Sequence, residues 1–281
     1  MTLMQASCLC KTRANVLGIG IHAVDVPSAV DIIEKAVARH VKGYVCVTGV
    51  HGVMEARRDP VMRTTLSRAL MVVPDGTPTV WMGRLQGLRQ MRRVFGPDLM
   101  LAVMSHSSLQ GCSHFLYGGD YGIAQALQAR LEQRCPTVRI VGTYTPPFRA
   151  LNPVEESDLF GLLNQLRPDI VWVGLSTPKQ ERFMAEYLPR LNTTLMIGVG
   201  AAFDFHAGRL KDSPRWIKAL GLQWLHRLYQ EPKRLWKRYL TNNPLFIVGA
   251  ILQLTGLRRY QLPLDSPDKV RSVLLSTQVS R

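Results

Sequence analysis

The chain has 281 residues, of which 46% are hydrophobic, so it is long and apolar enough to fold around a substantial core. Its formal net charge of +15 predicts an anionic partner, such as nucleic acid, acidic lipid or a phosphate-bearing substrate. Five cysteines, none in a CxxC pair, argue against a disulfide framework and indicate reduced thiols in a cytosolic protein. Residues 1–14 lack the apolar run of a signal peptide, and no apolar run is long enough to predict a transmembrane helix.

Apolar, β-branched runs alternate with helical patterns through the first two thirds of the chain. Strands are predicted at 16–21, 44–49, 69–74, 114–119, 138–144, 169–175 and 194–200. Apolar residues recur at helical spacing over 28–41, 122–134 and 155–166, where Ser157 is a candidate cap. Strands without polar alternation are buried on both faces, so the pattern predicts a mostly parallel α/β sheet. Such sheets bind ligands at the carboxyl ends of their strands, where glycine-rich loops here should line one cleft.

Two charged side chains near the third predicted strand are candidates for chemistry. Asp75, in VVPDGTP, follows a buried run, and a carboxylate at a cleft mouth suits a general base. The alternative is that Pro-Asp-Gly is only a turn. Arg93, in MRRVFGPDLM, could clamp a phosphate, and Asp98 could cap the following helix. Helix capping and an ordinary surface charge explain these two residues equally well.

The later loops offer further candidates but no cofactor motif. In GLSTPKQERF, Gln180 falls in a first helical turn, where it could bind a sugar or a phosphate or simply cap the helix. GVGAAFDFHAG lacks the third glycine of a dinucleotide fingerprint, because Phe203 stands there. Asp204 could bind a ligand or cap a helix. The histidines show no metal-ligand spacing, so we expect neither a metal nor a cofactor.

The character of the chain changes after about residue 205. Between positions 209 and 259 there are eleven basic and two acidic residues, so this region carries a net charge of +9 out of the +15 of the whole chain. Trp216, Leu220, Trp224 and Leu228 recur every four residues and predict one helical stripe, and Pro232 is placed to begin a second helix. The apolar stretch 244–256 is too short to span a bilayer. This region could bind a membrane surface or pack on the core as an ordinary amphipathic helix pair.

Seven motifs in order make the pattern specific. VVPDGTP, RRVFGPDLM, FLYGG, GTYTPPF, VGLSTPKQERF, GVGAAFDFHAG and LQWLHRLYQEPKRLWKRYL together resemble the WecG/TagA/CpsF family of bacterial glycosyltransferases. The resemblance covers roughly residues 15–240. It implies a Rossmann-like core over 15–205 and a basic, helical, membrane-associated appendage over 206–260, flanked by a tail over 1–14 and a flexible tail over 261–281.

The resemblance also implies an activity and a set of site residues. The expected reaction is an inverting, metal-independent transfer of a sugar from a UDP donor to a sugar on a polyprenyl diphosphate, at the cytoplasmic face of the membrane, in surface polysaccharide synthesis. N-acetylmannosamine, its uronic acid and glucose are all candidate donor sugars, and self-association is compatible with the family. Asp75 matches the proposed catalytic base. Substrate-binding positions of the family match Thr48, Arg93, Gln180, Arg227 and Arg234, and Lys237 stands where a third basic residue is expected.

This chain departs from the family pattern at two places, and two other readings stay open. The TxN signature is replaced by TGVH, with His51 in this region, and Gln223 replaces the glutamate of LEW. A nucleic-acid-binding protein is the alternative of a different class. The aromatic residues follow helical spacing rather than forming a stacking platform, so we expect no nucleic-acid partner. A nucleotide-dependent oxidoreductase on the same core is disfavoured by the incomplete glycine fingerprint.

Overall fold

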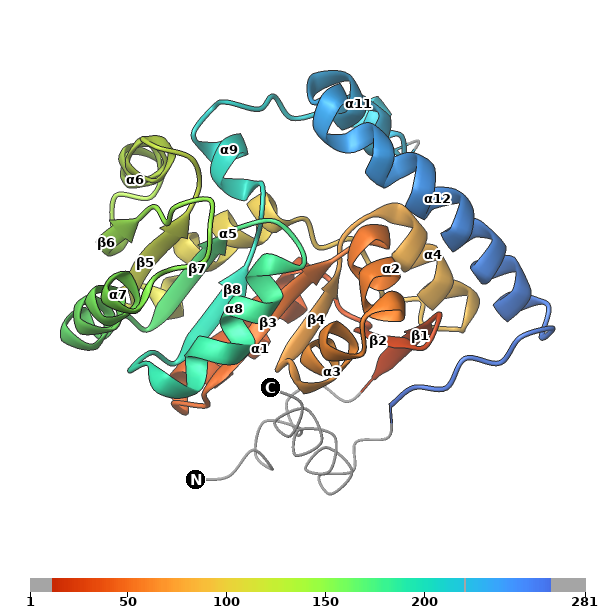
Figure 1. The fold of residues 1–281 in the computed structure, drawn as a ribbon, viewed down its shortest axis with the longest axis horizontal. Coiled ribbons are helices and arrows are strands. Elements are labelled where there is room, and N and C mark those ends of the chain that lie inside the picture. The colour runs from red at the N-terminus through yellow and green to blue at the C-terminus, as the bar shows by residue number, and fades with distance from the viewer. Residues whose placement is uncertain (1–11, 220, 264–281) are drawn as a thin grey trace.

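A computed structural model describes residues 12–219 and 221–263 (Figure 1). Its centre is a six-stranded sheet in the order β4-β3-β8-β7-β5-β6, and every neighbouring pair is parallel. The strands are β3 (Gly43–Thr48), β4 (Met71–Pro74), β5 (Ser113–Gly118), β6 (Arg139–Tyr144), β7 (Ile170–Gly174) and β8 (Leu195–Gly198). The predicted parallel α/β core is thereby confirmed.

Helices cover both faces of the sheet and create two apolar layers. Cys46 and its equivalents on other strands face one layer, whereas Val45 and its equivalents face the other. The first layer contains α2 (Val50–Arg58), α3 (Pro60–Arg68), α7 (Pro153–Leu166) and α8 (Lys179–Tyr187). The second contains α1 (Val26–Ala38), α5 (Gly96–Ser105), α6 (Ile123–Arg134) and α9 (Ala202–His206). Burial on both sides explains why the strand sequences show no polar alternation.

The prediction of one strand over 16–21 is wrong. The chain instead makes an antiparallel hairpin of β1 (Arg13–Val16) and β2 (Ile19–His22), which lies outside the six-stranded sheet. Leu17 and Gly18 form the turn with φ values of 53° and 85°, as a two-residue hairpin turn requires. The side chain of Asn15 accepts a hydrogen bond from Gly18 N at 2.8 Å and stabilises the turn.

Local capping decides where the helix at 153–166 begins. Asn152 caps α7, with Pro153 in the first turn, and the side chain of Glu155 accepts a hydrogen bond from the Asn152 backbone N–H. This capping box satisfies the first free amides of the helix. The predicted cap at Ser157 is therefore wrong, because the helix has already begun there. Likewise, Asp98 lies in the first turn of α5, whose N-cap position is Phe95 without a side-chain cap.

The strand order reverses next to β3 and β8. From β3 the chain moves outward to β4 on one side, whereas β5 to β8 fill the other side of the sheet. Ligands of doubly wound sheets bind where the order reverses in this way, beyond the carboxyl ends of the strands. Thr48, Asp75 and the segment 198–200 therefore share one edge.

The basic region forms three helices rather than the two that we expected. They are α10 (Arg215–Ala219), α11 (Gln223–Gln230) and α12 (Pro232–Leu254). Gly221, with φ of 71°, breaks the stripe that was predicted to run through one helix, and Leu220 of that stripe lies outside the described residues. Pro232 begins α12 as predicted. The apolar stretch 244–256 is the second half of this long helix and the turn after it.

Helix α12 is seated on the core along one stripe. Leu235 and Phe246 are buried, and Gly249 packs closely against Leu17 of the hairpin. Figure 1 shows α11 and α12 on the side of the molecule that carries α2 and α4 (Thr77–Leu85). Within the described ranges, no helix is both long and apolar enough to cross a membrane.

The chain after α12 returns along the hairpin. The Asn15 side chain donates a hydrogen bond to the Tyr260 carbonyl oxygen at 2.6 Å, and Arg63 donates one to the Gln261 carbonyl oxygen at 2.8 Å. Gln253 near the end of α12 accepts a hydrogen bond from Leu17 N at 2.9 Å. The second half of α12 is thus attached to the core at its far end as well as along its stripe.

Candidate active site at the carboxyl edge of the sheet

Asp75 and Arg93 meet at the edge where β3 and β4 end. The Asp75 N–H donates to the Thr48 carbonyl oxygen at 2.9 Å, so the ladder between the two strands continues into the loop. Val94 N donates to the Pro74 carbonyl oxygen at 2.8 Å and brings Arg93 alongside. Nε and Nη2 of Arg93 each lie 3.5 Å from Asp75 Oδ1, and both side chains are partly exposed. The two residues predicted for the base and for phosphate binding are therefore neighbours.

Thr48 and Gln180 lie in the apolar layer beneath this edge. Both are 2% exposed, and neither Thr48 Oγ1 nor Gln180 Oε1 has a hydrogen-bond partner among the described residues. The Gln180 side chain packs against β8 at Gly198, where an added Cβ would lie 3.2 Å from the amide carbon of Gln180. Buried polar groups are nearly always paired in folded proteins, so these oxygens are candidates for contact with a ligand or water.

Glu181 is a buried carboxyl group to which the sequence analysis gave no role. It is 0% exposed, and its Oε1 accepts hydrogen bonds from Thr177 Oγ1 at 2.9 Å and from Gln180 Nε2 at 3.0 Å. Its Oε2 has no partner among the described residues. Burial raises the pKa of Glu181, because the charged form loses its hydration. The sequence could have indicated Glu181 as a site residue, because it directly follows Gln180 at the start of a helix that comes after a buried strand.

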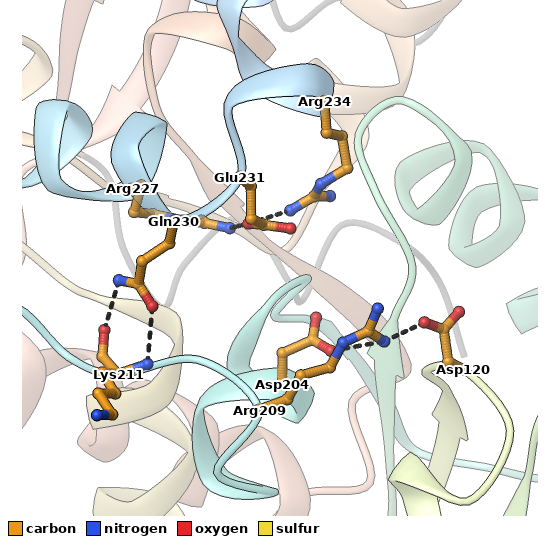
Figure 2. A network of polar contacts seen from close by, with 8 residues as sticks. All are labelled: Asp120, Asp204, Arg209, Lys211, Arg227, Gln230, Glu231 and Arg234. Carbon is orange, nitrogen blue, oxygen red and sulfur yellow. Dashed lines mark hydrogen bonds and ion pairs between the residues drawn. The ribbon is translucent and has the colours of Figure 1, made fainter.

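Arg227 and Arg234 both bind Glu231, the acidic residue between α11 and α12 (Figure 2). The N–O distances are 3.0 Å from Arg227 and 2.5 Å from Arg234. Burial favours the protonated form of Glu231, but the hydrogen bonds from these arginines outweigh it and lower its pKa. One carboxylate thus holds together the two appendage arginines that were predicted to bind substrate.

Two phenylalanine rings, each in contact with one guanidinium group, connect the appendage to the Asp75 pair. The Arg93 guanidinium lies 4.3 Å from the centre of the Phe95 ring, and Phe95 meets Phe205 edge to face at 5.4 Å. Arg227 lies over the other side of this pair, 5.5 Å from the centre of the Phe205 ring. Each arginine therefore contacts one ring of this pair, and the pair links Arg227 of the appendage to Arg93 beside Asp75.

The structure places Lys237 and Arg238 in different surroundings. Lys237 is exposed, and its ammonium group lies 5.5 Å from the ring centre of its neighbour Trp236. Arg238, which the sequence analysis did not select, is half-buried on the core side of α12. Burial and the nearby charge of Arg234 lower the pKa of Arg238. Arg234 and Arg238 are four residues apart and therefore lie on one face of the helix. This spacing could have indicated Arg238 as a candidate site residue.

A second set of charges joins the loop after β5 to α9 and the segment that follows it (Figure 2). Arg209 pairs with Asp120 and lies 3.6 Å from Asp204 Oδ1. Burial raises the pKa of Asp204, although Arg209 opposes the shift. Asp204 lies in the first turn of α9 without a side-chain capping hydrogen bond. It contributes a partly buried carboxylate to the same side of the molecule as Glu231.

One group of side chains in the described ranges could hold a metal ion, and it lies elsewhere. Its members are Asp31, Glu34 and His106, whose ligand atoms lie within 4.8 Å of one another. His106 ends α5, whereas Phe95 and the stack next to Asp75 are at the start of that helix. Asp31 is exposed, and exposed acidic groups of this kind are common without an ion.

The fold and the site define an α/β protein with charged side chains at the carboxyl edge of a parallel sheet, beneath a basic helical cover. Comparison with known sequences identifies it further. The glycosyl transferase WecG/TagA/CpsF family matches residues 14–260, and the chain belongs to this family.

A curated relative is the N-acetylglucosaminyldiphosphoundecaprenol N-acetyl-beta-D-mannosaminyltransferase of Bacillus subtilis (strain 168). The two chains are 30% identical over 177 residues, which is 63% of this chain and 66% of the relative. The match therefore spans just under two thirds of the relative's length.

Proposed function

We propose that this protein is an inverting glycosyltransferase that moves a sugar from a UDP donor to a sugar on a polyprenyl diphosphate. The proposed acceptor is N-acetylglucosaminyl-diphosphoundecaprenol, and N-acetylmannosamine is the first donor sugar to test, since the Bacillus subtilis relative carries both in its name. The observation that carries the proposal is the Asp75 carboxylate beside Arg93 at the carboxyl edge of the sheet. The product would enter surface polysaccharide synthesis.

Asp75 is the proposed general base. The acceptor hydroxyl attacks the anomeric carbon while the bond from that carbon to the diphosphate oxygen breaks on the opposite side. Asp75 takes the hydroxyl proton as the new bond forms, and such help contributes about 10²–10⁴-fold in rate. The carboxylate is partly exposed at the edge, within reach of an incoming hydroxyl. Arg93 binds the same carboxylate at 3.5 Å and is placed to exchange it for a phosphate oxygen when the donor arrives.

The negative charge of the departing UDP needs fixed positive charge around it. Arg93 contacts Phe95 and Arg227 contacts Phe205 of the same ring pair, and Arg234 shares Glu231 with Arg227. Arginine binds phosphate in a bidentate manner and stays charged at any physiological pH. We therefore propose that these arginines, together with the half-buried Arg238, stabilise the diphosphate, that the exposed Lys237 contributes less, and that transfer proceeds without added metal.

The outer side of α10 to α12 is proposed to rest on the cytoplasmic face of the membrane. Apolar residues are exposed along it, among them Trp216 at 63%, Leu240 at 67% and Ile251 at 54%. Lys233 and Lys237 are exposed on α12 as well. Attraction of about 1 kcal/mol for each basic residue near an anionic surface would add to the burial of these apolar groups. Flotation with anionic and neutral vesicles measures this attachment.

The test is turnover of UDP-N-acetylmannosamine, its uronic acid and UDP-glucose with the lipid-linked acceptor, with and without EDTA. Wild type is compared with Asp75→Asn and with Asp158→Asn, which changes an exposed aspartate on α7. Acceptor-dependent UDP release that survives EDTA, collapses in Asp75→Asn and persists in Asp158→Asn is the expected result. Equal release by all three proteins would remove Asp75 from the chemistry, and no release with any donor would contradict the proposed reaction.

A further inference from the structure

His51 connects helix α12 of the appendage to the core. It is the second residue of α2, and its side chain is 21% exposed. Its Nδ1 lies 2.9 Å from Nδ2 of Asn242, which is 3% exposed on α12. Its Nε2 lies 3.3 Å from the carbonyl oxygen of Thr177, in the loop between β7 and α8. One ring therefore touches the helix above it and the loop beside it.

The partners of His51 determine which nitrogen carries the proton. The amide nitrogen of Asn242 can only donate, so Nδ1 accepts, and Nε2–H donates to the Thr177 carbonyl oxygen. This arrangement requires a neutral ring. Burial and the nearby charges of Arg238 and Arg58 lower the pKa of His51 to about 4, although Glu55 Oε1 lies 3.7 Å from Nδ1. His51 thus acts as a fixed donor and acceptor near neutral pH rather than as a charge.

The hydrogen bonds continue from Thr177 to Gln180. Thr177 Oγ1 donates to Glu181 Oε1 at 2.9 Å, and the same oxygen accepts from Gln180 Nε2 at 3.0 Å. Because its amide nitrogen is committed to Glu181, Gln180 must present its oxygen, and this Oε1 is buried without a partner among the described residues. A chain of contacts therefore runs from Asn242 through His51, Thr177 and Glu181 to Gln180.

We propose that His51 is a positioning residue that couples the seating of α12 on the core to the orientation of Gln180. When α12 is in place, Asn242 holds the ring, the ring holds the Thr177 loop, and the loop fixes Glu181 and Gln180. Gln180 then offers an acceptor oxygen to a hydroxyl or amide N–H of the bound ligand. The inference rests on the proposed function only for its kinetic readout, since the coupling itself is a property of the unliganded protein.

The variants separate the two partners of His51. An asparagine side chain reaches the place of Nδ1, so His51→Asn keeps the contact with Asn242 and loses Thr177. A glutamine side chain reaches the place of Nε2, so His51→Gln keeps Thr177 and loses Asn242. The matched control is Gln253→Ala, which removes two hydrogen bonds between α12 and the hairpin without touching His51.

The kinetic arm is a double-mutant cycle on kcat/KM with Gln180→Ala. We expect His51→Ala, His51→Asn, His51→Gln and Asn242→Ala each to lower kcat/KM about tenfold, as coupled residues in one network do. In the Gln180→Ala background the same changes should cost less than about twofold, and Gln253→Ala should leave kcat/KM near the wild-type value. If the losses in kcat/KM from the His51 or Asn242 variants and from Gln180→Ala simply multiply, the residues act independently and the proposal is overturned. An equal loss of kcat/KM in Gln253→Ala would also overturn it.

Hydrogen exchange of residues 176–184 tests the coupling without any substrate. His51→Ala and Asn242→Ala should speed exchange of these amides about tenfold, because the loop loses its support, whereas Gln253→Ala should not. Unchanged exchange in Asn242→Ala would overturn the coupling even if activity fell. Faster exchange in a protein that transfers no sugar would support the coupling and refute only the proposed reaction.

Discussion

Gly49 lies where β3 and β4 end side by side, and its replacement by alanine tests how closely Asp75 must be placed. A Cβ on Gly49 would lie 2.7 Å from the Asp75 carbonyl oxygen. Ordinary van der Waals contact begins at 3.4 Å, so the two segments must separate by about 0.7 Å. The hydrogen bond from Asp75 N to the Thr48 carbonyl oxygen, 2.9 Å long, opposes this movement. The φ of Gly49 is −107°, which alanine adopts without strain, so the contact alone is tested.

The expected cost of Gly49→Ala has two parts. Overpacking of this kind lowers the free energy of unfolding by about 1–3 kcal/mol. A displacement of Asp75, the proposed base, by nearly 1 Å lowers kcat by up to about 10²-fold. KM for the donor should change little, because the arginines proposed to bind the diphosphate come from other segments. Initial rates at saturating donor and acceptor, with urea unfolding of the same protein, measure both parts.

Gly161→Ala is the matched control. Gly161 is exposed in α7, and a Cβ there meets no atom within 4 Å. Alanine should therefore stabilise the helix by about 0.5–1 kcal/mol without changing kcat. If Gly49→Ala is destabilised but keeps the wild-type kcat, the position of the Asp75 carboxylate does not limit the reaction, and the reasoning about this edge is refuted.

Three further predictions concern buried groups. Arg238→Ala should lower kcat/KM at least tenfold, which is on the order of one lost charged hydrogen bond. Lys237→Ala should lower kcat/KM much less. Initial rates of the two variants make the comparison. Burial raises the pKa of Glu181, so the folded state binds this proton more tightly than the unfolded state does. The free energy of unfolding should therefore fall as pH rises from 4.5 through the raised pKa. Urea titrations at several pH values measure this slope, and Glu181→Gln should remove it. Leu235→Ala, at 1% exposure, should cost about 2–5 kcal/mol, and Leu240→Ala, at 67%, should cost less than about 1 kcal/mol by the same titration.

Strand character and helix starts could be predicted because they depend on neighbouring residues. The runs at 44–49 and 169–175 lack polar alternation, as is typical of strands that are covered on both faces. The structure buries both runs in the sheet. Pro232 begins α12 since its fixed φ suits a first helical position. The run at 16–21 failed as one strand because a positive φ at Leu17 is invisible in an apolar pattern.

The candidate site was predictable as a set of residue types at loop positions, but not as a set of contacts. Nothing in the local sequence joins Arg93 to Asp75 or Phe95 to Phe205, since strand order and the path of α9 bring them together. The difference between Lys237 and Arg238 depends on which side of α12 meets the core. That side is chosen by Leu235, Phe246 and Gly249 acting together.

The sequence by itself determined the alternation of strands and helices, the glycine-rich strand ends and the concentration of positive charge after residue 205, because each is a property of neighbouring residues. Tertiary structure alone decided that Thr48, His51 and Gln180 share one layer beneath the sheet edge. Asn242 reaches His51 across 191 positions of the chain. Contacts at such separation are chosen by the packing of whole elements, whose burial of apolar surface outweighs the preference of any single side chain.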